Sequence, residues 1–508
     1  MNNKDWSGAA NILTNTTNKY RKGCPAVAFV KLSVCYRNQK NYTKARLIMS
    51  DAILLYPDDE TVLIERSEVN SVFVSREEDI AEWQNLLPKV NKRKAFIYKR
   101  LAGLNLENGN KREAFGILKK ALAEFPNDLE LFELMAKMYE LSDNLGKSIS
   151  IYNKLISSGG YVKKSVFISL AKDLIKTKQY EKAESVAKRG WTIFNDYRFK
   201  VIAAEIYTEQ DMWQQALKLW EELDLEVSSL SNVEEDIKLH AKLNVSVIKR
   251  IINVDGYVKK IKAYKESTKH KKYAIYTSYS RGYDQLKLPE NIDNRFDYAV
   301  FTDDTVDDFG VFKVRPLPSH GRDNPRKIRY AKTHPHVLFR NYDAVIWVDA
   351  SFLIAGDLFP LLYKFLESGN PIASTPHQHR SNIFEELEAC IALKKDDPLI
   401  MSHQVQRYKK EGFSGSPLAE NGILFFNLRC KLLPKVLETW WEEIKKNSKR
   451  DQLSFGYALF KNNASWHHIV ERPINMRNIK QFVLTPHGVD LQVLGSLNNL
   501  IRKRLDEK

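Results

Sequence analysis

Small side chains recur at nearly constant intervals through the first half of the chain. The interval is about 34 residues, and each small residue is followed by an apolar residue about four positions later, as in a helix that packs closely on a neighbour. The series consists of Ala45, Ala114, Ser148, Ala183 and Ala216. Its first interval is twice the others, which leaves room for a divergent repeat near residues 80–81. A fixed period of this length predicts an array of stacked helix pairs.

One complete unit of the array consists of Leu32, Tyr36, Ala45, Met49, Ala52 and Pro57. This unit resembles the tetratricopeptide repeat, in which small residues lie where two helices pack and a proline follows the second helix. The resemblance covers residues 1–225 and implies an all-α solenoid with a concave groove. We expect the groove to bind a protein partner or an extended polymer. The alternative is that the array serves only as a scaffold or a dimer surface.

The sequence changes character after the repeats. Residues 226–270 predict a helical linker that ends in a lysine-rich stretch. Between residues 271 and 490, short apolar segments alternate with helical ones, which predicts a mixed or parallel α/β sheet covered on both faces. The predicted strands cover residues 273–279, 298–302, 309–314, 344–348 and 371–374. Residues 491–508 predict a basic amphipathic tail.

The composition limits the classes of partner. The 508 residues carry a formal net charge of +16, which suits an anionic partner. The chain has no zinc-ligand spacing, RNA-recognition aromatic motif or helix-turn-helix pattern, so we expect no specific nucleic-acid partner. Contact of the basic segments with an anionic membrane surface is the remaining option. Much of the charge in the repeats is better explained by solvated lysines interspersed with glutamates.

The sequence also bears on the cellular compartment. No apolar stretch approaches the roughly 20 residues that span a bilayer. The first residues lack the apolar core of an export signal, so we expect none. The cysteines Cys24, Cys35, Cys390 and Cys430 are scattered without metal-ligand spacing, which is typical of reduced thiols. We therefore expect a cytoplasmic protein, with a peripheral position at the inner face of a membrane as an alternative.

The segment most informative about function is Y-D-A-V-I-W-V-D-A-S-F-L at residues 342–353. Its apolar run predicts a strand that is buried on both faces. Asp349 closes this strand, and a buried carboxylate is costly without a partner. In open α/β sheets, the carboxyl ends of the strands face the ligand crevice. Asp349 is therefore either a ligand of a divalent cation that holds a diphosphate, or a cap of the following turn.

Other polar residues come at the ends of neighbouring predicted strands, among them Thr277 and Asp303. Arg326, Lys327 and Arg329 lie on a predicted helix just before the strand that Asp349 closes. Arg326 and Arg329 are three residues apart and so share one face of that helix. Guanidinium groups bind diphosphates and carboxylates strongly. This set predicts a site for a nucleoside diphosphate between a metal ion and a basic helix.

Three stretches carry a family resemblance: N-P-R-K-I-R-Y-A-K-T-H-P-H at 324–336, Y-D-A-V-I-W-V-D-A-S at 342–351 and S-K-R-D-Q-L-S-F at 448–455. They resemble a glycosyltransferase-like family, long called a domain of unknown function, of plant Golgi proteins and bacterial polysaccharide clusters. The resemblance implies a GT-A-like, Rossmann-like mixed α/β domain. It also implies a nucleotide-sugar donor and a divalent metal cofactor, Mn²⁺ or Mg²⁺.

The chain departs from related enzymes at the metal motif. Those enzymes end the strand in Asp-x-Asp, whereas this chain has Asp349-Ala350-Ser351. The resemblance places both Asp349 and Ser351 at the donor site. One carboxylate and one hydroxyl bind a metal more weakly than two carboxylates, unless another acid or a late histidine completes the set. His487, in T-P-H-G, is the preferred histidine for metal or diphosphate contact.

Segments after the Asp349 strand supply further candidates. His377, His379 and Arg380 follow a predicted strand and suit a phosphate or a sugar, with a solvated loop as the alternative. Glu420 and Asn421 lie at the entrance of another strand. In glycosyltransferases of this type, an acidic residue at that position often meets the acceptor hydroxyl, so Glu420 is a catalytic candidate and Asn421 a sugar contact.

Asp451 and Gln452 open a predicted helix. A carboxylate at a helix N-terminus is favoured by the helix dipole, so Asp451 is either a cap or a catalytic residue. The family resemblance favours a catalytic Asp451 with Gln452 at the sugar.

The leading hypothesis is a glycosyltransferase that moves a sugar from a nucleotide-sugar donor to a glycan or glycolipid acceptor of bacterial surface-polysaccharide type, with the repeats binding acceptor or partner. The main alternative is a non-catalytic repeat scaffold that carries a degenerate transferase domain. A nucleic-acid protein is a third hypothesis, motivated by charge alone. The sequence leaves open the sugar, the linkage and whether the reaction inverts or retains the anomeric configuration.

Overall fold

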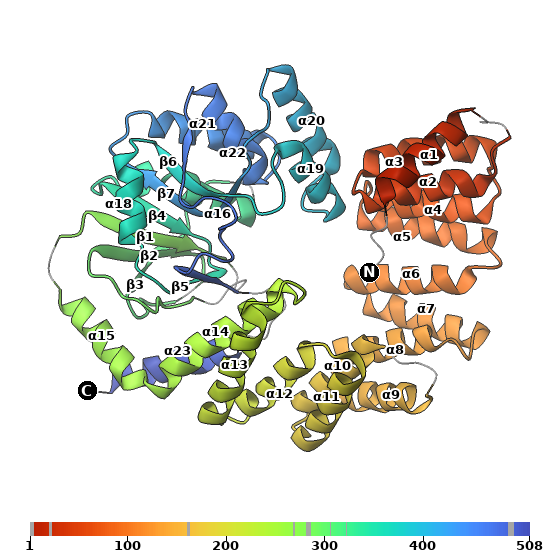
Figure 1. Ribbon diagram of the computed structural model, residues 1–508, viewed down its shortest axis with the longest axis horizontal. Coiled ribbons are helices and arrows are strands. Elements are labelled where there is room, and N and C mark those ends of the chain that lie inside the picture. Colours follow the sequence, from red (N-terminus) through yellow and green to blue (C-terminus); the bar gives the residue numbers. More distant parts are fainter. Residues whose placement is uncertain are drawn as a thin grey trace. The chain divides into compact units, whose positions relative to one another are not determined.

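The computed structural model describes residues 5–19, 23–159, 163–267, 270–280, 286–304, 306–321, 323–485 and 492–507 (Figure 1). The chain divides into two compact units. The first contains Met1–Ile202 and Glu388–Pro398, and the second contains Ala203–Leu387 and Leu399–Lys508.

Helices joined by short turns make up the first unit. They are α1 (Trp6–Lys19), α2 (Ala26–Asn38), α3 (Tyr42–Leu55), α4 (Glu60–Asn70), α5 (Arg76–Leu86), the 3₁₀ turn η1 (Leu87–Lys89), α6 (Lys94–Glu107), α7 (Lys111–Glu124), α8 (Leu129–Leu141), α9 (Leu145–Ser157), α10 (Lys164–Lys176), α11 (Tyr180–Phe194) and α12 (Arg198–Glu209), which spans the division. This run of helix pairs confirms the predicted repeat architecture.

The small residues of the sequence series occupy equivalent places in the structure. Each is the fourth residue of the second helix of a pair and is fully buried: Ala45 in α3, Ala114 in α7, Ser148 in α9, Ala183 in α11 and Ala216 in α13 (Trp213–Ser228). In α5 the same position carries Asp79, whose carboxylate accepts a hydrogen bond from the Ser71 hydroxyl. The substitution of a buried acid for a small residue explains why the series skips this repeat.

The second unit contains a seven-stranded sheet and a two-stranded sheet. The strands are β1 (Tyr273–Ser278), β2 (Phe296–Thr302), β3 (Phe312–Pro316), β4 (Ala344–Val348), β5 (Phe352–Ile354), β6 (Ile372–Pro376), β7 (Ala419–Asn427), β8 (Trp466–His468) and β9 (Phe482–Leu484). The larger sheet has the order β3-β2-β1-β4-β7-β6-β8, and β5 pairs with β9. β7 is antiparallel to its neighbours β4 and β6, whereas the other pairs of the larger sheet are parallel.

The predicted strands are therefore confirmed, with one shift. The strand predicted over residues 309–314 begins at Phe312, because Phe309 and Phe312 close a tight turn around Gly310. Gly310 has a φ of 60°, a backbone conformation that glycine adopts without strain.

Helices cover both faces of the larger sheet. They are α16 (Asn324–Thr333), α17 (Pro335–Leu338), α18 (Phe359–Glu367), α21 (Leu433–Lys446) and α22 (Asp451–Lys461). Between β6 and β7 the chain forms α19 (Ile383–Ala392), which spans the division between the units, and α20 (Pro398–Lys410). On one face, Trp347 and Leu424 belong to a core that also contains Ala331 of α16 and Trp440 of α21. On the other face, the ring of Phe365 in α18 packs on Phe425. Burial on both faces explains why β4 reads as a continuous apolar run.

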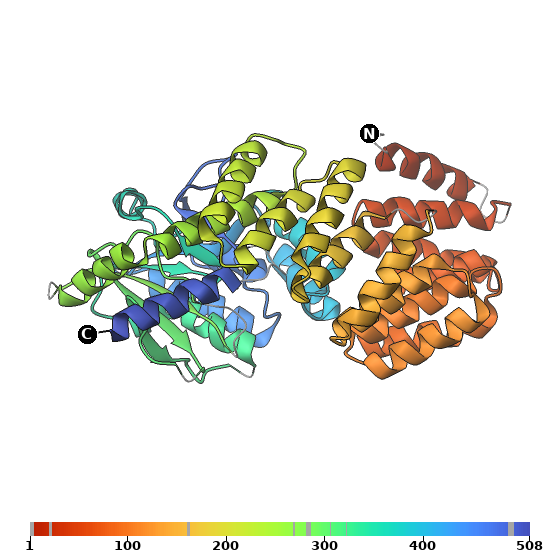
Figure 2. The same ribbon diagram turned by 90° about the horizontal axis from the view of Figure 1, so that it is seen from below.

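The second unit also contains α13, given above, and the helices α14 (Glu235–Ile252), α15 (Val254–Glu266) and α23 (Gln492–Asp506). The predicted basic tail forms α23, which lies beside α14 and α15 (Figure 2, dark blue and green). Its apolar side chains, including Leu494, Leu497 and Ile501, are buried there. The amphipathic character predicted for this segment is therefore explained by packing of its apolar side chains within the second unit.

Two sequence predictions of a general kind can be compared with the described residues. None of the described helices combines the length and the apolar character needed to cross a membrane. All four cysteines are free thiols, as predicted, and three of them, Cys24, Cys35 and Cys390, are buried.

Candidate active site

The order of the strands places a reversal at the centre of the sheet. The chain runs outward from β1 to β2 and β3 and then returns to the other side of β1 with β4. In open α/β sheets, ligands bind at such a reversal, outside the carboxyl ends of the strands. Thr277 and Ser278 end β1, and Asp349 follows β4. The hydroxyls of Thr277 and Ser278 are buried and lack a hydrogen-bond partner among the described residues, whereas most buried polar groups of proteins have one.

Hydrogen bonds orient Asp349, and part of its side chain remains exposed to solvent. The indole Nε1 of Trp347 donates a hydrogen bond of 2.6 Å to Oδ1 of Asp349. The backbone N–H of Asp349 donates to the carbonyl of Gly422 over 2.8 Å, which fixes the residue against β7. The side chain of Asp349 is still 37% exposed. Its carboxylate is therefore oriented by the sheet and accessible to a ligand.

A buried lysine connects Asp349 to a second acid. Lys332, on α16, is 1% exposed. Its Nζ lies 3.5 Å from Oδ1 of Asp349 and 2.8 Å from Oδ2 of Asp451. The same ammonium lies 5.5 Å from the ring centroid of Trp347. A desolvated cation is costly, and these contacts offset that cost.

Asp451, the first residue of α22, is buried and paired with two cations. Nε of Arg329 lies 3.0 Å from Oδ1 of Asp451, opposite the contact with Lys332. Burial raises the pKa of Asp451, but the charges of Arg329, Lys332 and Arg450 outweigh it and hold the pKa below its ordinary range. An acid that stays ionised, enclosed and doubly paired is poorly placed to exchange a proton with a substrate. Asp451 instead holds Lys332 in position beside Asp349.

A second group of polar residues lies at the same end of the sheet as Asp349, where β6 ends and β7 begins. We call this end of the sheet, at the carboxyl ends of the parallel strands, the sheet edge. Thr375 and Glu420 are register partners next to an irregularity between the strands, and Asn421 follows. The hydroxyl of Thr375, Oε2 of Glu420 and both amide atoms of Asn421 are buried without a hydrogen-bond partner among the described residues. Burial raises the pKa of Glu420, although Arg477, which contacts Oε1, opposes the rise. These atoms are suited to a ligand that offers both donors and acceptors.

His377 supports this group rather than adding a free ligand. Its Nδ1 accepts hydrogen bonds from the backbone N–H groups of His379 and Arg380, at 3.1 and 3.0 Å. Its Nε2 lies 3.8 Å from Oε1 of Glu420. Burial, with the charges of Arg380 and Arg477, lowers the pKa of His377 to about 3, so the ring is neutral at neutral pH. Arg380 is itself paired with Glu386 over 2.6 Å.

The three predicted phosphate-binding cations on α16 have different environments. Arg326 is buried, and its guanidinium donates to the carbonyl oxygens of Ile444 and Asn447, at 3.0 and 2.7 Å. It therefore caps the carboxyl end of α21. Lys327 is half-buried, and its side chain has no partner among the described residues. Of the three, Arg329 alone joins the network of Asp451 described above.

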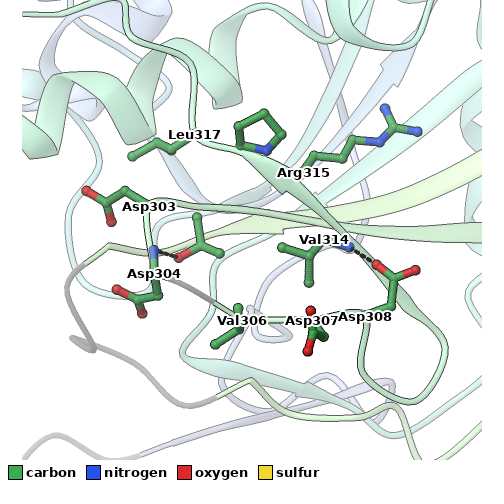
Figure 3. A pocket seen from close by; sticks show the side chains of 10 residues that line it. Asp303, Asp304, Val306, Asp307, Asp308, Val314, Arg315 and Leu317 are labelled. Atoms are coloured by element: carbon green, nitrogen blue, oxygen red, sulfur yellow. Dashed lines mark hydrogen bonds between the residues drawn. The ribbon is translucent and has the colours of Figure 1, made fainter.

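Asp303 lies in a separate acidic pocket beyond the end of β2. The pocket has a volume of about 740 Å³. Asp303 and Asp304 line one side of it, and Asp307 and Asp308 line the other (Figure 3). Arg315 is also part of the wall. Four carboxylates repel a phosphate, so the pocket suits the hydroxyl-bearing part of a nucleoside better than its diphosphate.

The remaining predicted residues have varied environments. Gln452 donates from Nε2 to the carbonyl of Ala419 over 2.8 Å, so it secures the start of β7. Ser351 is half-buried, and its carbonyl accepts from the N–H of Thr485. His379 is exposed. His487, the predicted metal contact, lies outside the described residues.

The described residues offer few ligands for a metal ion. They contain no group of three or more histidine, cysteine, aspartate or glutamate side chains placed to hold one. Asp349 supplies one carboxylate, and the ammonium of Lys332 competes for its Oδ1. Mg²⁺ is often held by one or two carboxylates together with substrate phosphates. This donor set therefore fits a divalent cation that arrives with a diphosphate, and does not fit a resident metal.

Sequence comparison identifies the type of domain that contains these residues. Residues 293–482 match the sequence model of the TOD1/MUCI70 glycosyltransferase-like domain, a span that contains Asp349, Glu420, Asn421 and Asp451. Residues 27–59 match a tetratricopeptide repeat. The chain carries a TOD1/MUCI70 glycosyltransferase-like domain preceded by tetratricopeptide repeats. Both resemblances expected from the sequence are thereby confirmed.

Individual relatives match parts of the chain. The glycosyltransferase-like domain is similar to the probable hexosyltransferase MUCI70 of Arabidopsis thaliana, with 25% identity over 203 residues, which is 34% of this chain and 34% of that protein. A tetratricopeptide repeat-containing protein of Methanocaldococcus jannaschii is 39% identical over 62 residues, 12% of this chain and 19% of that protein. The match thus spans about a third of one curated relative and a fifth of the other.

Solved structures resemble part of the chain. A tetratricopeptide repeat protein from Parabacteroides merdae is 18% identical, covers 47% of this chain and 92% of its own, and gives a TM-score of 0.38.

Sequence reasoning missed three residues of the glycosyltransferase-like domain that the structure places in these networks. Lys332 had a signal, because it lies three residues after Arg329 and so shares its helix face. Thr375 and Arg477 had none. They reach Glu420 through strand pairing and through a loop more than 50 residues away, contacts that only the fold reveals.

Proposed function

We propose that the second unit transfers a hexosyl group from a nucleotide-sugar donor to a glycan or glycolipid acceptor of bacterial surface-polysaccharide type. The observation that carries the proposal is a set of buried polar atoms that have no hydrogen-bond partner among the described residues. They lie at the carboxyl end of the parallel strands, on Thr277, Ser278, Thr375, Glu420 and Asn421. Each such atom costs about 1–3 kcal/mol unless a ligand satisfies it. A sugar offers hydroxyls that both donate and accept, and the similarity to a probable hexosyltransferase supports a hexose.

The diphosphate of the donor belongs beside Asp349 in this proposal. A divalent cation, Mn²⁺ or Mg²⁺, would be held jointly by Asp349 and the diphosphate oxygens, and it would offset the charge that the leaving diphosphate gains. Lys332 and Arg329 add positive charge to the same edge, although Asp451 neutralises part of it. Asp303 and its pocket would receive the hydroxyl-bearing nucleoside.

The sugar and the acceptor belong beside Glu420 and Asn421. The amide of Asn421 has a donor and an acceptor that are both without a partner among the described residues, which is what a pair of adjacent sugar hydroxyls requires. Glu420 has one oxygen bound by Arg477 and one free. The free oxygen is the proposed acceptor of the incoming hydroxyl's hydrogen bond, the position of a general base in an inverting reaction. Asp451 does not contact the sugar in this proposal; it positions Lys332 beside Asp349.

The tetratricopeptide repeats of the first unit are proposed to bind the acceptor polymer or a protein partner. Stacked repeats present an extended concave surface, which suits a long ligand.

A thermal-shift screen tests the proposal. Nucleoside diphosphates and nucleotide sugars, each with and without Mn²⁺, are added to the full chain. A donor that binds the native state raises the melting temperature by mass action. We expect one nucleotide to shift it, more with Mn²⁺, and Asp349→Ala to lose the shift. Asp343→Ala, at the opposite end of β4, is the control and should keep it. No shift from any nucleotide would contradict the proposal.

One observation favours a second function. The second acid of the metal motif is absent, and the remaining one, Asp349, already has a cationic neighbour in Lys332. Both features fit a domain that has lost donor binding and serves with the repeats as a non-catalytic scaffold. Capture of a partner by the repeats, without nucleotide binding in the screen, would support this alternative.

A further inference from the structure

A second cavity lies in the elbow between α14 and α15, within the second unit. Its volume is about 530 Å³. The wall is formed by Lys249 and Arg250 from α14, by Asn253 and Lys260 from the elbow and α15, and by Glu290 of the loop before β2. None of the residues placed above at the sheet edge lines this cavity. We call it the α14–α15 pocket.

The guanidinium of Arg250 is the buried charge of this pocket. Arg250 is 7% exposed. Its Nη1 donates to the carbonyl of Leu288 over 2.8 Å, and its Nε to the carbonyl of Ser246 over 3.4 Å. Its Nη2 is buried and meets no acceptor in hydrogen-bond geometry among the described residues. The guanidinium also lies over the ring of Tyr257, 5.5 Å from the ring centroid, and its charge opposes the rise in the pKa of the Tyr257 hydroxyl that burial causes. A buried, charged donor without an acceptor is costly, so the position calls for an anion.

The first turn of α15 faces the same elbow. The N-cap residue of α15, Asn253, makes no side-chain hydrogen bond to the first turn. The first N–H groups of a helix have no partners within it, and they carry the positive end of the helix dipole. Gly256 lies in this turn and lines the pocket. Together with Arg250, the turn provides a set of N–H donors from two helices.

The charges around the pocket are positive in sum. Lys249, Arg250 and Lys260 contribute three cations, and Glu290 contributes one anion. Glu290 is engaged with the hydroxyl of Ser246 over 2.7 Å. Nζ of Lys249 forms an ion pair with Oε1 of Glu221 over 2.7 Å. Planar guanidinium, helix N–H groups and a mobile ammonium are the groups that bind phosphate in proteins.

We propose that the α14–α15 pocket binds a phosphate group, at a site separate from the sheet edge. The volume exceeds what one phosphate needs, so a sugar that carries the phosphate also fits. Two ligands carry such a group, namely a phosphorylated acceptor of the reaction proposed above and inorganic phosphate. The experiment below distinguishes them. This inference does not depend on the proposed transfer reaction, because it rests on different residues.

The test is calorimetric titration of the full chain with glucose 1-phosphate, inorganic phosphate and glucose. We expect both phosphates to bind and glucose alone not to bind. Tighter binding of glucose 1-phosphate identifies a sugar phosphate as the ligand, and equal binding identifies free phosphate. Lys260→Glu reverses a charge at the pocket and should weaken binding about tenfold. Lys259→Glu is the control, because Lys259 is exposed on the same helix and does not line the pocket.

Three results would overturn the inference. The first is the absence of phosphate binding to the folded wild type. The second is an equal loss in Lys259→Glu and Lys260→Glu, since that shows attraction to the general charge of the surface. The third is a loss in Asp349→Ala with no loss in Lys260→Glu, since that places the phosphate at the sheet edge. If the proposed transferase activity fails while Lys260→Glu still lowers phosphate affinity, the pocket stands on its own.

Discussion

Replacement of Lys332 by methionine removes the cation that joins Asp349 to Asp451. Methionine keeps most of the volume, so the change acts mainly on charge. Asp451 would remain buried with Arg329 as its nearest cation, 3.0 Å away. Removal of one partner of a buried ion pair costs about 3–5 kcal/mol. Because Arg329 stays in place, we expect the lower end, about 3 kcal/mol at neutral pH. For a unit of this size, that loss lowers the melting temperature by roughly 6–12 °C.

The loss should depend on pH. The folded-state pKa of Asp451 lies below its ordinary value, so its ionised form contributes stability above that value and loses it as the pH falls towards the folded-state pKa. Lys332→Met removes one of the cations that lower the pKa of Asp451. Burial then raises this pKa above its wild-type value. The difference in stability between variant and wild type is therefore greatest at neutral pH and shrinks in acid, where the variant's carboxyl is protonated.

Thermal unfolding of the full chain at pH 7 and pH 5 measures both effects. Lys327→Met, on the same helix and without an ion-pair partner among the described residues, is the matched control and should change little. The double variant Lys332→Met with Asp451→Asn should be less destabilised than the sum of the single variants, because it leaves no buried charge unpaired. A melting temperature of Lys332→Met within about 2 °C of the wild type would refute the reasoning.

Three other predictions follow from the structure. Mn²⁺ alone should not bind measurably to wild type by calorimetry, and it should bind in the presence of the correct nucleoside diphosphate, because Asp349 supplies one ligand; metal binding without nucleotide would contradict this. Asn421→Ala and Glu420→Gln should each lower transfer about 100-fold in a steady-state assay, without loss of folding by circular dichroism. The repeat unit should lose stability as the pH rises from about 4 to about 6, because burial raises the pKa of Asp173 from 3.8 to about 6. Asp173→Asn should abolish this dependence in thermal unfolding, and an unchanged profile would show that another group titrates.

The fold was predictable from the sequence because its signals are local and repeated. A small residue at the fourth position of every second helix marks a contact that each repeat must make, so the spacing reports the architecture directly. The strand before Asp349 is buried on both faces, and for this reason its sequence is a continuous apolar run that can be recognised. The exception, Asp79 in α5, is a place where a hydrogen bond to Ser71 replaces close packing.

The site was less predictable because its residues acquire their partners through the fold. The sequence places Arg326 and Arg329 on one face, yet one caps α21 and the other pairs with Asp451. Asp451 was expected to be a catalytic residue, whereas its burial and two cations indicate a positioning role. The local sequence does not show that Arg326 meets the end of α21. It places Lys332 on the helix face of Arg329, but it does not show that both cations meet Asp451 of α22. The roles predicted for Glu420 and Asn421 stay predictions.

The most direct test of the central claim is release of nucleoside diphosphate from a panel of nucleotide sugars in the presence of short glycan acceptors. We predict release from one donor by the wild type, a loss of about 100-fold in Asn421→Ala, and no loss in Asn427→Ala, at the other end of the same strand. No release from any donor by the folded protein, or equal release by Asn421→Ala, would contradict a transfer site at this edge of the sheet.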